Sequence, residues 1–206
     1  MLPRVASRWL YNQIKWIEED STMKKFLALV LASLMLMSMS AFGLAEEEAG
    51  FDEYELGVEG EQEVGFMTMA MVYFQPVDMA PAENATPKEG SDLHIEVDLT
   101  ANENPYGFPV DGWVPYLSID FVIKDLEGKE VYSGSMMHMA ASDGPHYGNN
   151  IPLAEGEYTI TLYIKSPAEN GYLLHVDAET GVEAKDGFWT EPLTATWSGW
   201  KFVKEW

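Results

Sequence analysis

The sequence predicts an all-β protein, an immunoglobulin-like β-sandwich formed by a single domain. Three observations predict this fold class. Apolar and polar residues alternate in Asp92–Thr100, which places the apolar ones on one face of a strand. Several short segments of this kind are separated by turn signals rich in Gly, Pro and Asn. Long helical periodicity is missing after residue 45. Short strands with such punctuation are typical of β-sandwiches.

Five further segments have strand composition, because Val, Ile, Tyr, Thr and Trp are frequent in them. They are Met67–Gln75, Val114–Ile123, Glu130–Met137, Glu157–Ile164 and Leu193–Val203. Turn signals such as Glu127-Gly128-Lys129 and Glu155-Gly156 lie between them, and Asp78–Gly90 reads as a polar loop. The chain contains no Cys, so the disulfide of antibody domains is absent and the prediction concerns architecture only.

The N-terminal part precedes the sandwich and predicts export. Met23-Lys24-Lys25 opens a basic segment, an apolar run follows as far as Ala45, and an acidic stretch begins at Glu46. This is the plan of a secretory signal peptide over residues 23–45. The run is almost long enough to span a bilayer, so the alternative is an uncleaved anchor. Residues 1–22 read as a mis-assigned upstream extension, 46–63 as a flexible acidic leader, and 64–206 as the sandwich.

Charge limits the partners of the exported part. The chain has 12 basic and 34 acidic residues, of which five basic and three acidic ones precede residue 46, so 7 and 31 remain. Such a surface repels nucleic acids and anionic membranes, so we expect no nucleic-acid binding and no stable membrane insertion after cleavage. It attracts cations, although an exported protein can also be acidic merely because the charge keeps it soluble. Without Cys, a metal site must use His, Met, Asp or Glu.

Histidine is scarce after residue 45, so the context of each one is informative. His94 and Glu96 are two residues apart on one predicted strand, and their side chains therefore leave the same face. This geometry suits two metal ligands, although a solvated strand face can carry the same pair. His146 lies in Asp143–Gly148 (DGPHYG), where Gly and Pro predict a tight, rigid loop.

Two more candidates lie close to turns. Met139 stands seven residues before His146 and reaches it if the chain doubles back through residues 140–144. His138 precedes Met139 and is expected to face away from it, because neighbours on a strand point to opposite sides. His175 follows a Gly-containing turn, where a solvated loop histidine is the simpler interpretation. Met136 and Met137 are interpreted as core filler.

Five motifs together resemble the bacterial periplasmic iron-transport protein family, small exported proteins that bind copper and work beside a membrane iron permease. They occur in the family's order over about residues 64–202. The motifs are Tyr73–Met79 (YFQPVDM), Asp92–Glu96 (DLHIE), Gly107–Pro109 with Trp113–Leu117 (GFP, WVPYL), Asp143–Gly148 (DGPHYG) and His175–Val182 (HVDAETGV).

The resemblance implies an immunoglobulin-like homodimer in the periplasm, or otherwise outside the cytoplasm, that partners an inner-membrane iron permease. It also implies a metal site, whose ligands are carried over motif by motif. They are His94, Glu96, Met139, His146 and His175. Met79 is implied to lie near the site. The implied metals are copper and iron, with zinc or manganese as substitutes.

The implied ligand set is chemically mixed. Imidazoles suit copper, zinc and iron, a thioether favours copper, and a carboxylate favours the harder iron. Because only neutral His can ligate, affinity is expected to fall as the imidazoles protonate, roughly between pH 7 and 5. We further hypothesise that Glu96 changes between a direct ligand and an outer partner when the metal changes oxidation state.

The predicted function is therefore non-enzymatic: capture of iron, with copper at the same or an adjacent site, and its presentation to the permease. Two alternatives of related chemistry stay open, copper handling and a copper-dependent iron oxidase or reductase. A third alternative is an adhesion or sugar-binding sandwich, suggested by Trp113, Trp189, Trp197, Trp200 and Trp206. Core packing explains most of these aromatics.

Overall fold

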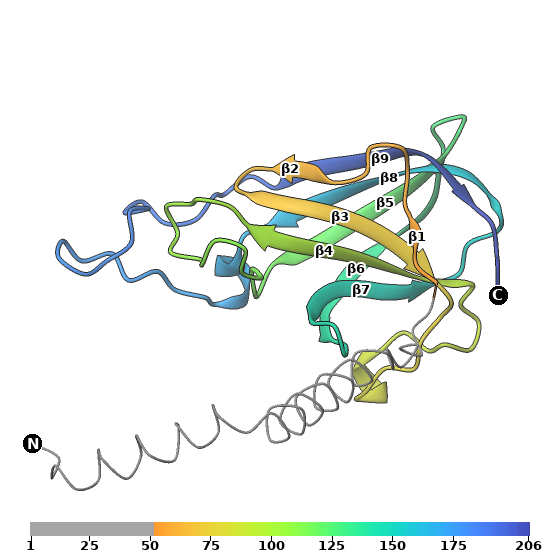
Figure 1. The fold of residues 1–206 in the computed structure, drawn as a ribbon, viewed down its shortest axis with the longest axis horizontal. Helices are drawn as coiled ribbons and strands as arrows, with labels where there is room; N and C mark the ends of the chain where they lie inside the picture. Colours follow the sequence, from red (N-terminus) through yellow and green to blue (C-terminus); the bar gives the residue numbers. More distant parts are fainter. Residues whose placement is uncertain (1–51) are drawn as a thin grey trace, which may run out of the picture. The chain divides into compact units, whose positions relative to one another are not determined.

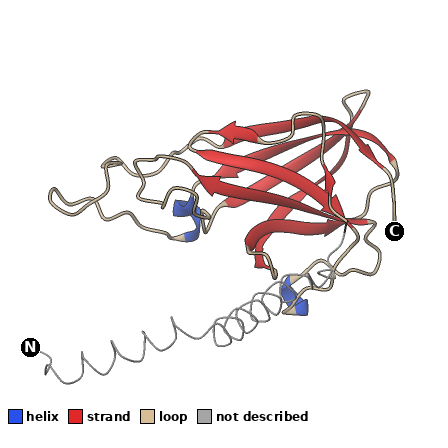
Figure 2. Ribbon diagram, in the orientation of Figure 1, coloured by secondary structure: helices blue, strands red, loops and turns tan. Residues whose placement is uncertain are grey.

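Nine antiparallel strands form the fold of the computed structural model, which describes residues 52–206. The predicted signal peptide and upstream extension therefore lie outside the described residues. The strands are β1 (Tyr54–Glu55), β2 (Gln62–Val64), β3 (Met67–Phe74), β4 (Leu93–Ala101), β5 (Ser118–Asp125), β6 (Glu130–Ala140), β7 (Pro145–Ile151), β8 (Gly156–Lys165) and β9 (Leu193–Phe202). Two short 3-10 turns, Ala82–Asn84 and Pro167–Asn170, complete the fold (Figure 2).

The strands follow one hydrogen-bonded path in the order β1-β3-β4-β7-β6-β5-β8-β9, with β2 also paired to β3. Strand β6 belongs to both layers of the sandwich: it pairs with β5 as far as Met136 and with β7 from Met137 onward. Figure 1 shows the resulting curled sheet, in which β3 and β4 pass across β5 and β8. The predicted β-sandwich is thus confirmed, with its two layers joined along β6.

Apolar side chains from both layers meet between them. Met69 and Ile95 point inward from one layer, while Phe121 and Leu162 point inward from the other, and all are 1% exposed or less. Trp197 and Trp200 from β9 are also buried, and the indole N–H of Trp197 donates to the Gly60 carbonyl. These two tryptophans stabilise the core and offer no surface for a sugar.

The predicted strands are found within a few residues of their expected bounds, with one shift. Strand β5 begins at Ser118, whereas the sequence predicted a start at Val114. Residues 115 and 116 form a turn in which Tyr116 has a left-handed backbone, with φ of 62°. Such a residue does not fit an extended strand, so β5 is shorter than the composition suggested.

Three strands were not predicted. β1 and β2 lie in or at the edge of the segment expected to be a flexible leader, and Leu56 between them is only 1% exposed. The packed domain therefore begins before Val64. β7 replaces the tight loop expected around His146, and the turn lies earlier, where the Ala141 N–H donates to the Gly144 carbonyl over 2.9 Å.

Two long loops, residues 102–117 and 171–192, leave the same end of the sandwich (Figure 1). The Ala184 N–H donates to the Pro105 carbonyl, and Phe108 stacks on Tyr172. The loop after β3 includes the first 3-10 turn and lies where the sequence predicted a polar loop, Asp78–Gly90. None of the described residues forms a helix long and apolar enough to cross a membrane.

Candidate metal centre

The side chains of the centre project from the outer face of two central strands. In the β4–β7 ladder, His94 stands opposite Asn150 and Glu96 opposite Gly148. Ile95, between these two residues, and Val97, after Glu96, point into the core. The period of two therefore puts His94 and Glu96 on one face, as predicted. Although this face is the outer one, His94 is 0% exposed and Glu96 is 4% exposed.

Asn150 fixes the protonation of His94. The Asn150 amide nitrogen donates to the carbonyls of Val77 and Thr86, so its Oδ1 is left as an acceptor. That oxygen lies 2.9 Å from His94 Nδ1, which must therefore carry the ring proton. Burial lowers the pKa of His94 to about 4, an effect larger than the opposing hydrogen bond to Asn150. The ring is thus neutral, with its lone pair on Nε2.

That lone pair has no partner. His94 Nε2 is buried and makes no hydrogen bond. The backbone of Gly148 lies beside it, and a Cβ at this position would stand 2.5 Å from His94 Nε2. A buried acceptor left unsatisfied in a space that a methyl group would fill is costly unless a ligand occupies that space. A metal ion fits these requirements, because neutral imidazole nitrogen is a common metal ligand.

Glu96 and His146 complete the group. His146 Nδ1 lies 3.0 Å from Glu96 Oε1, and both side chains are almost fully buried. Burial, followed by repulsion from Asp98 and Asp143, raises the pKa of Glu96 to about 8. Burial also lowers the pKa of His146. Both shifts favour the uncharged forms, so burial favours a hydrogen bond between the two side chains over an ion pair.

His94, Glu96 and His146 each offer one ligand atom, and these atoms lie within 4.8 Å of one another. In the part of the chain that the structure describes, no other three histidine or acidic side chains meet this criterion. Acidic residues lie next to the group: Asp98, Asp111 and Asp143 line a neighbouring hollow together with His146. Their charges would be offset by a bound cation.

Met139 lies where the predicted hairpin requires. It is opposite His146 in the β6–β7 ladder, so both side chains leave the same face of the sheet. His138 is opposite Tyr147, whose ring it contacts at 6.4 Å, and thus faces the other way, as expected. Met79 lies in the loop after β3 and lines a pocket with Met139.

His175 is not part of the group within one chain. It is exposed on the 171–192 loop, where its Nε2 lies 2.7 Å from Asp177 Oδ2. Asp177 in turn accepts hydrogen bonds from the backbone of Glu179 and Thr180, which makes this part of the loop compact. The structure therefore brings together His94, Glu96 and His146, places Met139 beside them, and leaves His175 apart.

Sequence reasoning missed Gly148 and Asn150. Both follow His146 closely in the run His146–Asn150, where Gly and Asn resemble turn residues. The one feature of the sequence that could have indicated their role is that a glycine and an amide residue closely follow the candidate ligand His146. Only the β4–β7 register shows that Gly148 and Asn150 lie beside the two predicted ligands on β4.

The fold and the site together define a metal-binding β-sandwich. A family model described as "Fe2+ transport protein" matches residues 50–204, and the chain belongs to this family. The family is one of metal-binding transport proteins, which agrees with the expectation that the chain is not an enzyme.

Relatives with curated sequences support this assignment. The 34 kDa membrane antigen of Treponema pallidum is 40% identical over 163 residues, which cover 77% of this chain and 78% of the antigen. A UPF0423 protein of Brucella abortus is 38% identical over 151 residues, which cover 71% of this chain and 81% of that protein.

Solved structures show the same fold. FetP from uropathogenic Escherichia coli strain F11 superposes with a TM-score of 0.66 at 38% identity, covering 75% of this chain and 98% of FetP. Copper-reconstituted P19 of Campylobacter jejuni superposes with a TM-score of 0.64 at 37% identity, covering 73% of this chain and 95% of P19.

Proposed function

We propose that this protein is exported to the periplasm, captures iron for uptake and presents it to an inner-membrane permease, and that copper binds at the same centre. Two observations together carry the proposal: His94, Glu96 and His146 are buried with ligand atoms within 4.8 Å of one another, and the Nε2 of His94 has no partner. Membership of the iron-transport family and the copper-bound state of the P19 structure support it.

The proposed ligands are His94, Glu96 and His146, with Met139 contributed by β6. A carboxylate and two imidazoles suit iron, and the thioether adds affinity for copper. By the Irving–Williams order, Cu(II) binds such a set more tightly than other divalent first-row ions. Copper binding in vitro alone therefore does not distinguish iron transport from copper handling. Zinc or manganese would be substitutes of the same charge.

His175 reaches the centre only if a second copy supplies it, and we include such a homodimer in the proposal. The stretch of the loop next to His175 exposes apolar side chains: Leu173 is 86% exposed, Val176 44% and Tyr172 37%. Adjacent exposed apolar side chains are common at protein–protein interfaces. In this arrangement the loop of one protomer would cover the outer face of β4 and β7 in its partner.

Copper handling and a copper-dependent iron oxidase or reductase are the competing functions of the same centre. Cellular measurements distinguish them. We would compare strains producing the wild type, Met139→Ile, His146→Ala and, as a control, Tyr163→Phe on the exposed face of β8. Iron uptake, total copper and copper tolerance would be measured together.

Iron transport predicts that His146→Ala lowers iron uptake while copper tolerance stays normal, and that Met139→Ile acts in the same direction. Reduced copper tolerance with normal iron uptake would instead assign the centre to copper handling. Turnover of ferrous to ferric iron by the copper-loaded protein would support the oxidase. Sugar binding that survives the loss of His94 and His146 would favour the adhesion alternative.

A further inference from the structure

The methionines of the described residues fall into two groups. Three of the seven lie on β3, point into the core and are at most 2% exposed: Met67, Met69 and Met71. The other four all line a single pocket: Met79, Met136, Met137 and Met139. Core filling therefore accounts for the first group, while the second gathers around one cavity for which the metal centre requires only Met139.

The pocket lies where β6 passes from one layer to the other. Its pairing with β5 ends at Met136, and its pairing with β7 begins at Met137. The cavity of about 580 Å³ opens in this fork, and the loop around Met79–Ala85 forms one wall. Met137 and Met139 leave the same side of β6, because they are two residues apart on one strand.

Three of the four thioether side chains are accessible. Met136 is 6% exposed, whereas Met79, Met137 and Met139 are only half-buried. Methionine has an unbranched, flexible side chain, so sulfur atoms from a strand and a facing loop can converge on one ligand. Thioether sulfur is a soft ligand that selects Cu(I) over the harder divalent ions.

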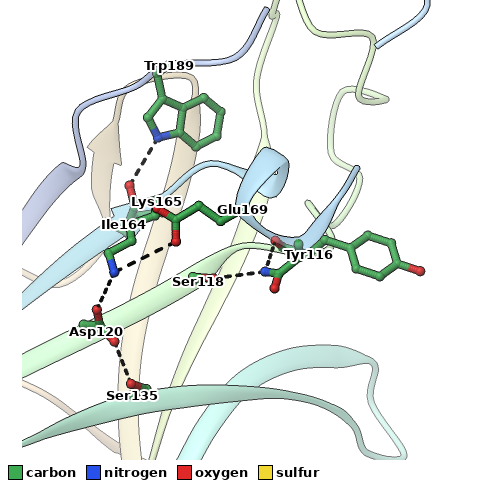
Figure 3. A network of polar contacts seen from close by, with 9 residues as sticks. Tyr116, Ser118, Asp120, Ser135, Ile164, Lys165, Glu169 and Trp189 are labelled. Atoms are coloured by element: carbon green, nitrogen blue, oxygen red, sulfur yellow. Dashed lines mark hydrogen bonds and ion pairs between the residues drawn. The ribbon is translucent and has the colours of Figure 1, made fainter. Parts of the chain in front are cut away.

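Other residues that line the pocket are polar and carry an excess of negative charge, and Figure 3 shows their contacts with one another. Lys165 Nζ lies 3.0 Å from Asp120 Oδ2 and 3.9 Å from Glu169 Oε2. The Ser135 hydroxyl donates to Asp120 Oδ1 over 2.6 Å. Because two carboxylates enclose the single ammonium group, this group of residues does not attract anions, and it is compatible with a cation.

We propose that this pocket is a second metal site, specific for a soft monovalent ion such as Cu(I), which binds to the thioethers of Met79, Met137 and Met139. Binding exchanges the ion's water or carrier ligands for sulfur and involves no redox step. Met139 also stands opposite His146, so it connects the pocket to the metal centre. This connection rests on the proposed function, whereas the soft site itself does not.

Silver(I) is a suitable probe, since it is soft and monovalent. The purified, metal-free protein would be titrated calorimetrically with Ag(I) and, without oxygen, with Cu(I). The test variant is Met79→Leu/Met137→Leu, which removes two sulfur atoms and spares Met139. The matched control is Met71→Leu in the core. Cu(II) binding and thermal unfolding of each variant would be measured in parallel.

We expect the double variant to bind Ag(I) at least tenfold more weakly than the wild type, with Cu(II) binding and unfolding unchanged. Met71→Leu should bind Ag(I) like the wild type. His94→Ala should lose Cu(II) binding and keep Ag(I) binding. Wild-type Ag(I) affinity in the double variant would overturn the proposal, as would loss of Ag(I) binding in His94→Ala. Neither result would bear on iron uptake, which is tested separately.

Discussion

Asn150 determines which nitrogen of His94 is available to a metal. Its amide accepts from His94 Nδ1 and also holds the loop after β3 through the Val77 and Thr86 carbonyls. Partners of this kind orient metal ligands, and their loss typically weakens metal binding about 10–100-fold. We predict a decrease in this range for Asn150→Leu, measured as the Cu(II) dissociation constant by competition with a chelator.

Asn149→Leu is the matched control for this substitution. Asn149 is the neighbouring amide on β7, donates to the Ser135 carbonyl and belongs to the opposite face of the strand. Equal losses of Cu(II) affinity in the two variants would mean that disturbance of β7, and not the bond to His94, explains the effect.

Gly148 provides the space next to His94 Nε2. A Cβ there would lie 2.5 Å from that nitrogen and 2.9 Å from the Ile95 carbonyl oxygen. We predict that Gly148→Ala abolishes measurable Cu(II) binding and lowers the melting temperature of the metal-free protein. Gly134→Ala is a control on β6, where the added methyl group meets Phe121 at 3.1 Å, away from the centre. Full Cu(II) binding by Gly148→Ala would contradict the assigned position of the metal.

If Glu96 is a metal ligand, as proposed, its raised pKa makes metal binding depend on pH. Its pKa in the metal-free protein is raised to about 8, so below this pH a bound cation must displace a proton. His94, with its pKa lowered to about 4, stays neutral above pH 6. We predict that Cu(II) affinity rises up to about tenfold per pH unit between pH 6.5 and 8 and then levels off.

Glu96→Gln should flatten this dependence. An equally steep profile in the variant would instead assign the titration to the imidazoles, which the sequence had placed roughly between pH 7 and 5. The same shifts affect metal-free stability with opposite signs. The raised pKa of Glu96 costs stability as pH rises from 4.5 to about 8, and the lowered pKa of His94 costs stability as pH falls from 6.5 to about 4.

Strand β7 shows what the sequence could and could not predict. The strands with alternating apolar residues, β4 above all, were recognised, because burial of one face imposes that alternation. β7 has the composition of a turn, yet six of its seven residues are buried. Pairing with both β4 and β6 overrides its low strand propensity. Gly148, Asn150 and His146 of β7 lie at the candidate centre. At this site the low strand propensity of the residues therefore disagrees with the strand that they form.

The residues of the candidate centre were predictable to different degrees for the same reason. His94 and Glu96 follow from the period of two, and Met139 with His146 from a hairpin with a short turn. Gly148 and Asn150 depend on the register between strands distant in sequence, which a single sequence does not reveal. The domain start was also placed too late, because β1 and β2 are short and pair only through tertiary contacts.

The 171–192 loop carries a prediction about assembly. Leu173 is 86% exposed and lies two residues before His175. If this loop contacts a second copy, Leu173→Glu should convert the dimer to monomer while leaving the melting temperature of the fold nearly unchanged. Analytical ultracentrifugation measures the change, and Leu126→Glu, at the exposed β5–β6 turn, is the control. An unchanged mass for Leu173→Glu would place the interface elsewhere.

At the scale of the molecule, an acidic sandwich surrounds a buried, largely uncharged ligand group. The chain has a formal charge of −22, and its negative field raises the local concentration of cations. In the proposed function, the choice of ion is then made at the centre, where the soft thioether, the imidazoles and the carboxylate of Glu96, once it has lost its proton, bind the ion together. The negative surface thus explains why cations are attracted, and the ligands of the centre explain which cation is bound.

The central claim is that His94, Glu96 and His146 hold the metal. The most direct test is a crystal structure of the copper-loaded protein with anomalous scattering recorded at the copper edge. We predict an anomalous peak about 2.0–2.1 Å from His94 Nε2, a typical metal–nitrogen distance, in contact with Glu96 and His146. An anomalous peak only among the exposed carboxylates, with His94 Nε2 still unpartnered, would contradict the claim.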